Sequence, residues 1–360
     1  MNTTRSCGIY DTGYQQQGNS ILRTRTQKLL LIIGVVLLLT VPLLCFDDKY
    51  MSLVNHIGIT IIIVLGLQIL AGYCGIISLG QAGFMGVGAY TSGLLCTQLG
   101  LSFWLAIPVA TLVAGIVGFI FGLPTLKLRG GFYLVIITLA AGVALPTVLD
   151  MITPYATGTF GRLTVSAPPP ELGGIVFDSQ TRMFFIIMFF VALAIFFVRN
   201  LSKSRIRRMF VAISDNDLAS EGIGINVPLY RLIAFFICCA FAGVGGSLYA
   251  HWMREIGYFD FFWTESMWYF GVIVVGGMGS IAGAILGSVI IRTVSFFITM
   301  DLIPHIQWWF PATFSMGKVA GLNPLILSAV VLLFLIFAPR GVVHWAKGVI
   351  SSFRLWPLSY

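Results

Sequence analysis

Apolar runs of the length that crosses a lipid bilayer dominate the sequence. The first covers 29–46, the last covers 322–338, and similar runs fill most of the chain between them. Charged residues make up only 9% of the 360 residues, against about 25% in a soluble domain. Because one spanning helix takes about 20 mainly apolar residues, we expect an all-α membrane protein with about ten transmembrane helices.

Polar segments between the runs predict how the chain is oriented in the membrane. Lys and Arg concentrate in cytoplasmic loops, so the basic segment within 200–229 is expected to be cytoplasmic. The tails 1–27 (polar, expected to be disordered) and 346–360 (basic) are placed on the same side, with a single membrane domain over 28–345 between them. The net charge of +8 is explained by these loops and does not indicate a nucleic-acid partner. The segment 150–182 is expected to be an external loop.

Two glycine-rich segments interrupt the apolar runs. The segment 75–90 (GIISLGQAGFMGVGAY) contains five glycines, and 276–280 (GGMGS) repeats its character in the second half of the chain. Glycines let membrane helices pack closely, or they mark a helix break whose free backbone groups line a protected polar cavity. On the second interpretation, candidate residues lining a translocation pathway are Ser78, Gly80, Gln81, Gly83, Gly276, Gly277, Gly279 and Ser280.

Ionisable and thiol side chains inside the apolar runs are few. Arg292 lies within one of these runs, where an arginine at the bilayer centre costs about 2.5–3.5 kcal/mol on insertion scales. We therefore expect its span to be shortened, tilted or displaced.

The six cysteines have no CxxC spacing and lie mostly in apolar runs. This pattern indicates small buried side chains and no disulfide or metal site.

A short helix is predicted inside the cytoplasmic segment. Ser214 precedes Asp217 by three residues, the spacing of a capping box. Asp215 and Asp217 would then occupy the first turn, where the helix dipole favours acids. Leu218 and Ile223 give the helix an apolar side. Gly222 or Gly224 can end it.

Several motifs, taken in order, resemble one family. They are 75–90, LKLRGGFY at 126–133 with Thr138, the segment from Arg208 through Ala212–Ile213 to Gly224–Asn226, Ala234–Phe235 with Ala242–Gly243, GGMGS at 276–280, and PRG at 339–341. The chain resembles the membrane permease subunits of branched-chain amino acid ABC importers, from about 73 to 341.

The resemblance implies a function and a set of partners. It implies translocation of an amino acid delivered by a periplasmic binding protein, a second permease subunit, and two ATPase subunits that use ATP, in a bacterial inner membrane. It also implies that Asp215, Asp217, Leu218, Glu221 and Gly224 belong to a coupling helix seated on an ATPase. No cofactor is expected in this chain, and no catalytic residue.

Other classes of protein fit the sequence less well. A P-loop is absent, so ATP use requires other subunits. The string GMGSIA at 277–282 fits a dinucleotide pattern but follows no strand. Ion-coupled carriers place acids or histidines within their spans, whereas here the acids fall in loops. An intramembrane enzyme lacks its HExxH or GxSG motif, and a related ABC importer for urea, amides or another small solute remains the alternative.

Overall fold

A computed structural model describes residues 47–126, 131–157, 164–172, 175–302, 322–338 and 341–345. The expected tails 1–27 and 346–360 and the first apolar run, 29–46, lie outside these residues. One compact unit begins at Ser52, and of the preceding unit only 47–51 are described.

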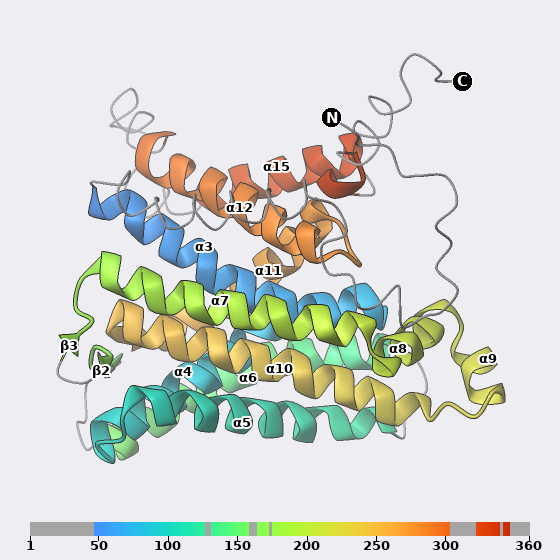
Figure 1. The fold of residues 1–360 in the computed structure, drawn as a ribbon, viewed down its shortest axis with the longest axis horizontal. Helices are drawn as coiled ribbons and strands as arrows, with labels where there is room; N and C mark the ends of the chain where they lie inside the picture. Colours follow the sequence, from blue (N-terminus) through green and yellow to red (C-terminus); the bar gives the residue numbers. More distant parts are fainter. Residues whose placement is uncertain are drawn as a thin grey trace, which may run out of the picture. The chain divides into compact units, whose positions relative to one another are not determined.

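The described chain is almost entirely helical, as expected from its apolar runs (Figure 1). The long helices are α3 (Asp48–Leu67), α4 (Gln81–Gln98), α5 (Phe103–Gly122), α6 (Gly131–Thr157), α7 (Gln180–Lys203), α10 (Val227–Met253), α11 (Trp263–Gly276), α12 (Ile281–Phe297) and α15 (Leu322–Phe337). Shorter helices are α8 (Arg205–Asp215) and α9 (Asp217–Gly222), with 3-10 turns η2 (Leu123–Leu126) and η3 (Tyr258–Phe261) and π-turns η1 (Gln68–Tyr73) and η4 (Ile298–Leu302).

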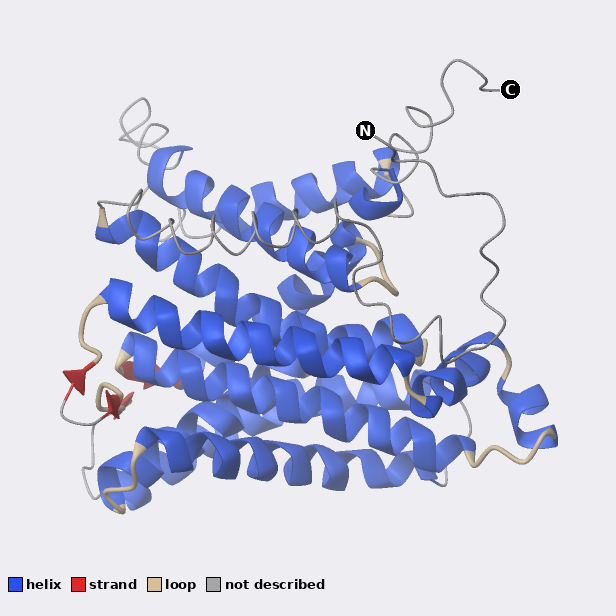
Figure 2. Cartoon of the chain, in the orientation of Figure 1, coloured by secondary structure: helices blue, strands red, loops and turns tan. Residues whose placement is uncertain are grey.

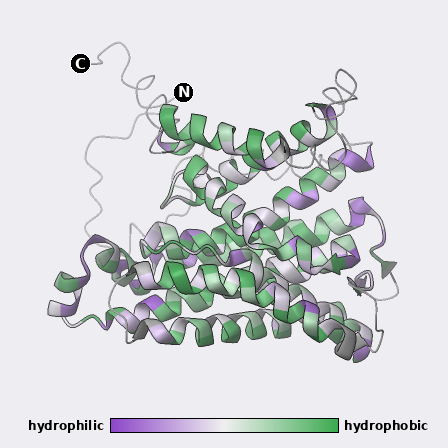
Figure 3. Cartoon of the chain, turned by 180° about the vertical axis from the view of Figure 1, so that it is seen from behind, coloured by the Kyte–Doolittle hydropathy of each residue, from purple (hydrophilic) through white to green (hydrophobic). Residues whose placement is uncertain are grey.

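Seven helices in the described residues are long and apolar enough to cross a membrane. They correspond to α3 with η1, α5, α6, α7, α10, α12 with η4, and α15 with the residues after it. Helices α4 and α11 fall outside this set, so the expected total of about ten is not established. Hydrophobic residues run along the middles of the helices, while hydrophilic ones gather at their ends (Figure 3).

The core forms where α10 packs against α4 and α5. Small residues make this approach possible: a Cβ atom on Gly88 of α4 would lie 2.5 Å from the Cα and carbonyl oxygen of Gly243 in α10, and one on Gly115 of α5 would lie 2.8 Å from the Phe236 ring. Glycine therefore serves close helix packing here, one of the two roles considered for the glycine-rich segments.

Four short strands lie at one end of the helices (Figure 2). Strands β1 (Thr164–Ser166) and β4 (Glu255–Gly257) pair antiparallel, as do β2 (Glu171–Leu172) and β3 (Ile175–Val176). These strands were not expected, and α6 continues to Thr157, into the segment 150–182 that was predicted to be an external loop. The small helices α8 and α9 lie at the opposite end (Figure 1).

We expect Gly88→Val to destabilise the α4–α10 contact. The new side chain meets the backbone of Gly243, which cannot rotate away, and overpacking of this kind costs about 1–3 kcal/mol. Thermal unfolding in detergent measures the effect. The matched control is Gly222→Ala, where a Cβ atom meets nothing within 4 Å. Equal midpoints for the two variants would contradict this packing.

Candidate functional site

The first glycine-rich segment contains a true helix break. The π-turn η1 ends at Tyr73, residues 74–80 are non-helical, and α4 begins at Gln81. Two backbone N–H groups near the break are satisfied by hydroxyls from other helices: Leu79 donates to Thr138 Oγ1 (3.2 Å) and Ala82 donates to Ser266 Oγ (2.9 Å). Hydroxyl side chains serve in this way where a membrane helix is interrupted.

The second break separates α11 from α12. Gly277 and Gly279 have φ angles of 107° and 85°, which only glycine adopts without strain. Ser280 starts α12 as its N-cap, and its Oγ accepts a hydrogen bond from Gly283 N (3.0 Å). Both interruptions predicted from the glycine pattern are therefore present, although the first is confined to 74–80.

The second break contacts η1, the turn that leads into the first break, through Gln68 and Gly72. With its amide oxygen facing the second break, the buried Gln68 side chain accepts hydrogen bonds from the backbone N–H of Ser280 (2.8 Å) and of Gly279. The approach is close, since a Cβ atom on Gly72 would lie 2.7 Å from Gly279 N. We call this contact, made by Gln68, Gly72, Gly279 and Ser280, the break junction.

A third segment closes on the second break. Gly341 follows the last long helix with φ of 83°, and a Cβ atom on it would lie 2.5 Å from Gly277 N. The glycine of the PRG motif thus packs directly on the glycine pair of the GGMGS motif.

Most of the predicted lining residues are buried within this chain. Gly80 and Gly83 pack against α6, where a Cβ atom on Gly83 would lie 3.2 Å from the Ala141 carbonyl oxygen. Gln81 is buried, and its Nε2 donates to the Cys238 carbonyl oxygen (3.1 Å). Ser78, Gly276 and Gly277 are also buried, whereas Gly279 is exposed and Ser280 is half-buried. Their role in lining a pathway stays a prediction.

The short helix predicted in the cytoplasmic segment exists, but its beginning was misplaced. Asn216 is the N-cap of α9, and its Oδ1 accepts from Ala219 N (3.1 Å). Ser214 and Asp215 instead belong to the last turn of α8, so the prediction that Ser214 caps the helix and Asp215 lies in its first turn is wrong. Asp217 is in the first turn, and the helix ends at Gly222, one of the two glycines expected to end it.

Two apolar side chains are exposed at α9, Leu218 within the helix and Ile223 at its C-cap. Leu218 and Ile223 are 74% and 76% exposed, and Glu221 and Gly224 are exposed as well. Asp217 forms an ion pair with Arg231, the fifth residue of α10. This ion pair ties the beginning of α9 to a long helix.

The preceding helix, α8, contacts the first break. The guanidinium carbon of Arg207 lies 5.0 Å from the centre of the Tyr73 ring, at the end of η1. A Cβ atom on Gly75 would lie 2.5 Å from Ser214 Oγ. A continuous series of contacts therefore leads from α9 through α8 to the break junction.

Arg292 lies inside α12, which continues past it to Phe297. Of the three expectations for its span, shortening is wrong, whereas tilting or displacement stays a prediction. The side chain finds partners in two other helices. Nε donates to Thr60 Oγ1 (2.9 Å), Nη2 lies 3.4 Å from Glu265 Oε2, and the guanidinium carbon is 5.5 Å from the centre of the Tyr269 ring.

Sequence reasoning missed Gln68, Arg231 and Asn216. A glutamine in an apolar run is a weak signal on its own, and its partners at the second break are more than 200 positions away. Asn216 fits the pattern of an N-cap as well as Ser214 does, and no local signal separates the two.

Comparison with known proteins places the chain in a family. Residues 50–338 match the family model described as the branched-chain amino acid transport system permease component. The LivM permease protein of Salmonella typhimurium is 31% identical over 291 residues, which cover 74% of this chain and 68% of the relative. LivM of Escherichia coli is 30% identical with the same coverage. A probable LivH permease of Methanocaldococcus jannaschii is 25% identical over 81% of this chain and 90% of its own.

No solved structure matches the chain significantly. The family match covers well over half of the chain and agrees with its apolar helices. The chain is a multi-pass membrane protein that belongs to the family of branched-chain amino acid transport permease components.

Proposed function

We propose that this chain is one of two permease subunits in an ABC importer of the bacterial inner membrane. A periplasmic binding protein delivers a branched-chain amino acid to the strand end of the helices. Two ATPase subunits act at the α8–α9 end, which is cytoplasmic together with both termini. ATP is bound and hydrolysed by those subunits, and the permease contributes the path through the membrane.

The observation that carries the proposal is the exposed apolar side of α9. Leu218 and Ile223 are exposed at the end of a membrane domain, where an uncovered apolar surface marks an interaction site. The acids Asp217 and Glu221 lie on the same short helix. Such a surface fits a groove on a soluble partner, in the manner of a helix that docks by its apolar face.

The contacts around the break junction support a mechanism for coupling. Force applied to α9 passes to α10 through the Asp217–Arg231 ion pair and to η1 through the contacts that α8 makes with Tyr73 and Gly75. The turn η1, which leads into the first break, contacts the second break through Gln68. A movement of α8 and α9 therefore alters the junction, and the pathway opens when the two breaks separate.

The identity of the solute rests on the relatives. Those compared are named as branched-chain amino acid permeases, and a nucleoside permease of Lactococcus lactis, 26% identical over 49% of the chain, is also similar. Uptake assays that compare leucine with a nucleoside and with urea, using the complete transporter, distinguish these solutes. Leucine uptake driven by ATP is the expected result, and uptake by the permease alone driven by a cation gradient would contradict the proposal.

Acidic substitutions on α9 test the docking surface. Leu218→Asp and Ile223→Asp replace exposed apolar side chains and leave the interior unchanged, so we expect insertion to be normal while binding of the ATPase falls about tenfold or more. Co-purification of the ATPase subunits measures the loss. Leu99→Asp, at a position 68% exposed near the strand end, is the control that keeps the ATPase bound. Full ATPase recovery with both α9 variants would disprove docking at this helix.

Gln68→Leu tests the break junction. The substitution leaves two backbone N–H groups of the second break without their acceptor, and each unsatisfied group costs about 1–3 kcal/mol. We expect the ATPase subunits to remain bound and ATP hydrolysis to continue while leucine uptake falls. Parallel assays of ATP hydrolysis and uptake in proteoliposomes show the uncoupling. The same change at the exposed Gln98 should leave both activities intact, and coupled transport by Gln68→Leu would refute the mechanism.

A further inference from the structure

The geometry points to a binding site for an aliphatic amino acid zwitterion in the cleft bounded by α11, α12 and α15. We propose that Arg292 binds the carboxylate of the amino acid, that Glu265 binds its ammonium group, and that the apolar wall of the cleft holds its side chain. This inference rests on the proposed function and deepens it, because it gives the permease a substrate site of its own in addition to that of the binding protein.

The first observation is a charged pair within an apolar segment. Arg292 lies in a candidate membrane span, and its side chain is only 10% exposed. Ionisable residues at such positions are costly and mark substrate or ion pathways. Arg292 is the one charged residue of α12, whose other residues are apolar, small or hydroxyl-bearing.

The second observation is that the pair retains binding capacity. Guanidinium carries five N–H donors. Thr60 takes one, Glu265 faces another at 3.4 Å, and the Tyr269 hydroxyl takes a third, so donors remain for a ligand. A charge-assisted hydrogen bond of this kind is usually about 2.7–2.9 Å long, so the pair is not closed. The Glu265 side chain is 34% exposed. A ligand carboxylate can take a place on Arg292 while Glu265 turns to the adjacent ammonium group.

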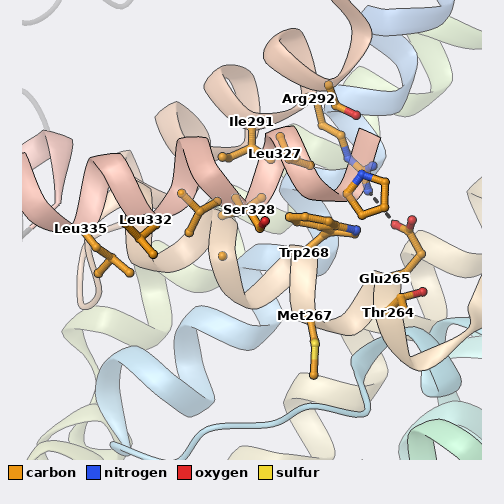
Figure 4. A pocket seen from close by; sticks show the side chains of 15 residues that line it. Thr264, Glu265, Met267, Trp268, Ile291, Arg292, Leu327, Ser328, Leu332 and Leu335 are labelled. Atoms are coloured by element: carbon orange, nitrogen blue, oxygen red, sulfur yellow. Dashed lines mark hydrogen bonds and ion pairs between the residues drawn. The ribbon is translucent and has the colours of Figure 1, made fainter. Parts of the chain in front are cut away.

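The third observation is the cleft itself, whose volume is about 700 Å³. This volume lies within the range of about 300–1,000 Å³ that is typical of small-molecule sites. Figure 4 shows Arg292 and Glu265 together at one side of the cleft, with Trp268 and Leu327 beside them and Leu332 farther along the wall. Two opposite charges at one side and an aliphatic wall beyond match the two parts of leucine, isoleucine or valine.

The site is placed where occupancy can act on the break junction. Glu265 is in the first turn of α11 and Arg292 is in α12, and the second break connects these two helices. A ligand held between the two side chains fixes the relative position of both helices. A bound amino acid therefore acts on the second break, which lies next to the contacts that α8 makes with Tyr73 and Gly75.

Direct binding tests the site. Radiolabelled leucine is dialysed against the full permease–ATPase complex in nanodiscs, without binding protein and without ATP. Competitors are 3-methylbutylamine, which lacks the carboxylate, and 4-methylpentanoate, which lacks the ammonium group. We expect leucine to bind and each competitor to bind about ten- to a hundredfold more weakly, as expected for loss of a hydrogen bond to a charged group.

Two variants identify the charged residues. In Arg292→Gln, leucine should lose its advantage over 3-methylbutylamine, whereas in Glu265→Gln it should lose its advantage over 4-methylpentanoate. The control is Arg254→Gln, an exposed arginine paired with Asp178 near the strand end, which should bind as wild type does. An unchanged preference for leucine in both cleft variants, or an absence of leucine binding to the wild-type complex, overturns the site.

A third variant tests the cleft without touching the charges. Ser328→Phe narrows the cleft from α15 and should weaken leucine binding more than alanine binding. Equal effects on both amino acids would place the ligand elsewhere.

The proposed function is tested separately by leucine uptake with the binding protein present. Uptake by a wild-type complex that binds no leucine in nanodiscs leaves the function standing and removes the site. Leucine binding to the complex without any uptake supports the site and contradicts the proposed function.

Discussion

Backbone N–H and C=O groups surrounded by apolar side chains and lipid must be hydrogen-bonded within the protein. Continuous helices meet this requirement by themselves, but the chain interrupts its helices at 74–80 and again after Gly276. Thr138, Ser266 and Gln68 supply the missing partners from other helices. Gln68 therefore links the second break to η1, the turn that leads into the first break.

The small helices α8 and α9 contact both the first break and the long helix α10. Helix α9 makes an ion pair with α10, while α8 contacts the first break at Tyr73 and Gly75. By contrast, α10 is packed closely along α4 and α5 through Gly88, Gly243 and Gly115. Close-packed interiors transmit strain with little deformation. We infer that a displacement of α9 is taken up at the two breaks and not in the α4–α5–α10 core.

The sequence predicts much of the fold, because an apolar run of about 20 residues has essentially one structure in a bilayer. It also predicts both breaks, and it names Gly222 as one of two residues that can end α9, the other being Gly224. It does not predict which part of 75–90 is broken: Gly80 and Gly83 pack against α6, and only 74–80 leave the helix. The N-cap of α9 was misassigned because Ser214 and Asn216 both fit the local pattern, and the contact of Ser214 with Gly75 is not encoded locally.

Long-range pairs account for the rest of what was missed. Among the described residues, Arg292 has no charged or polar partner nearby in the sequence, because its partners Thr60 and Glu265 belong to two other helices. Gln68 and the second break are separated by more than half of the chain. Single polar residues in apolar runs therefore point to long-range contacts, but the sequence does not identify their partners.

Hydrogen–deuterium exchange at Gly279 and Ser280 tests the central claim most directly. Their N–H groups face the Gln68 amide, which accepts from both when its oxygen is turned toward them. Exchange can be followed by mass spectrometry on the assembled transporter in nanodiscs through its nucleotide states. The account predicts protection in the state without nucleotide and faster exchange at both positions in at least one ATP-dependent state. Equal protection in every state of an actively transporting complex would contradict it.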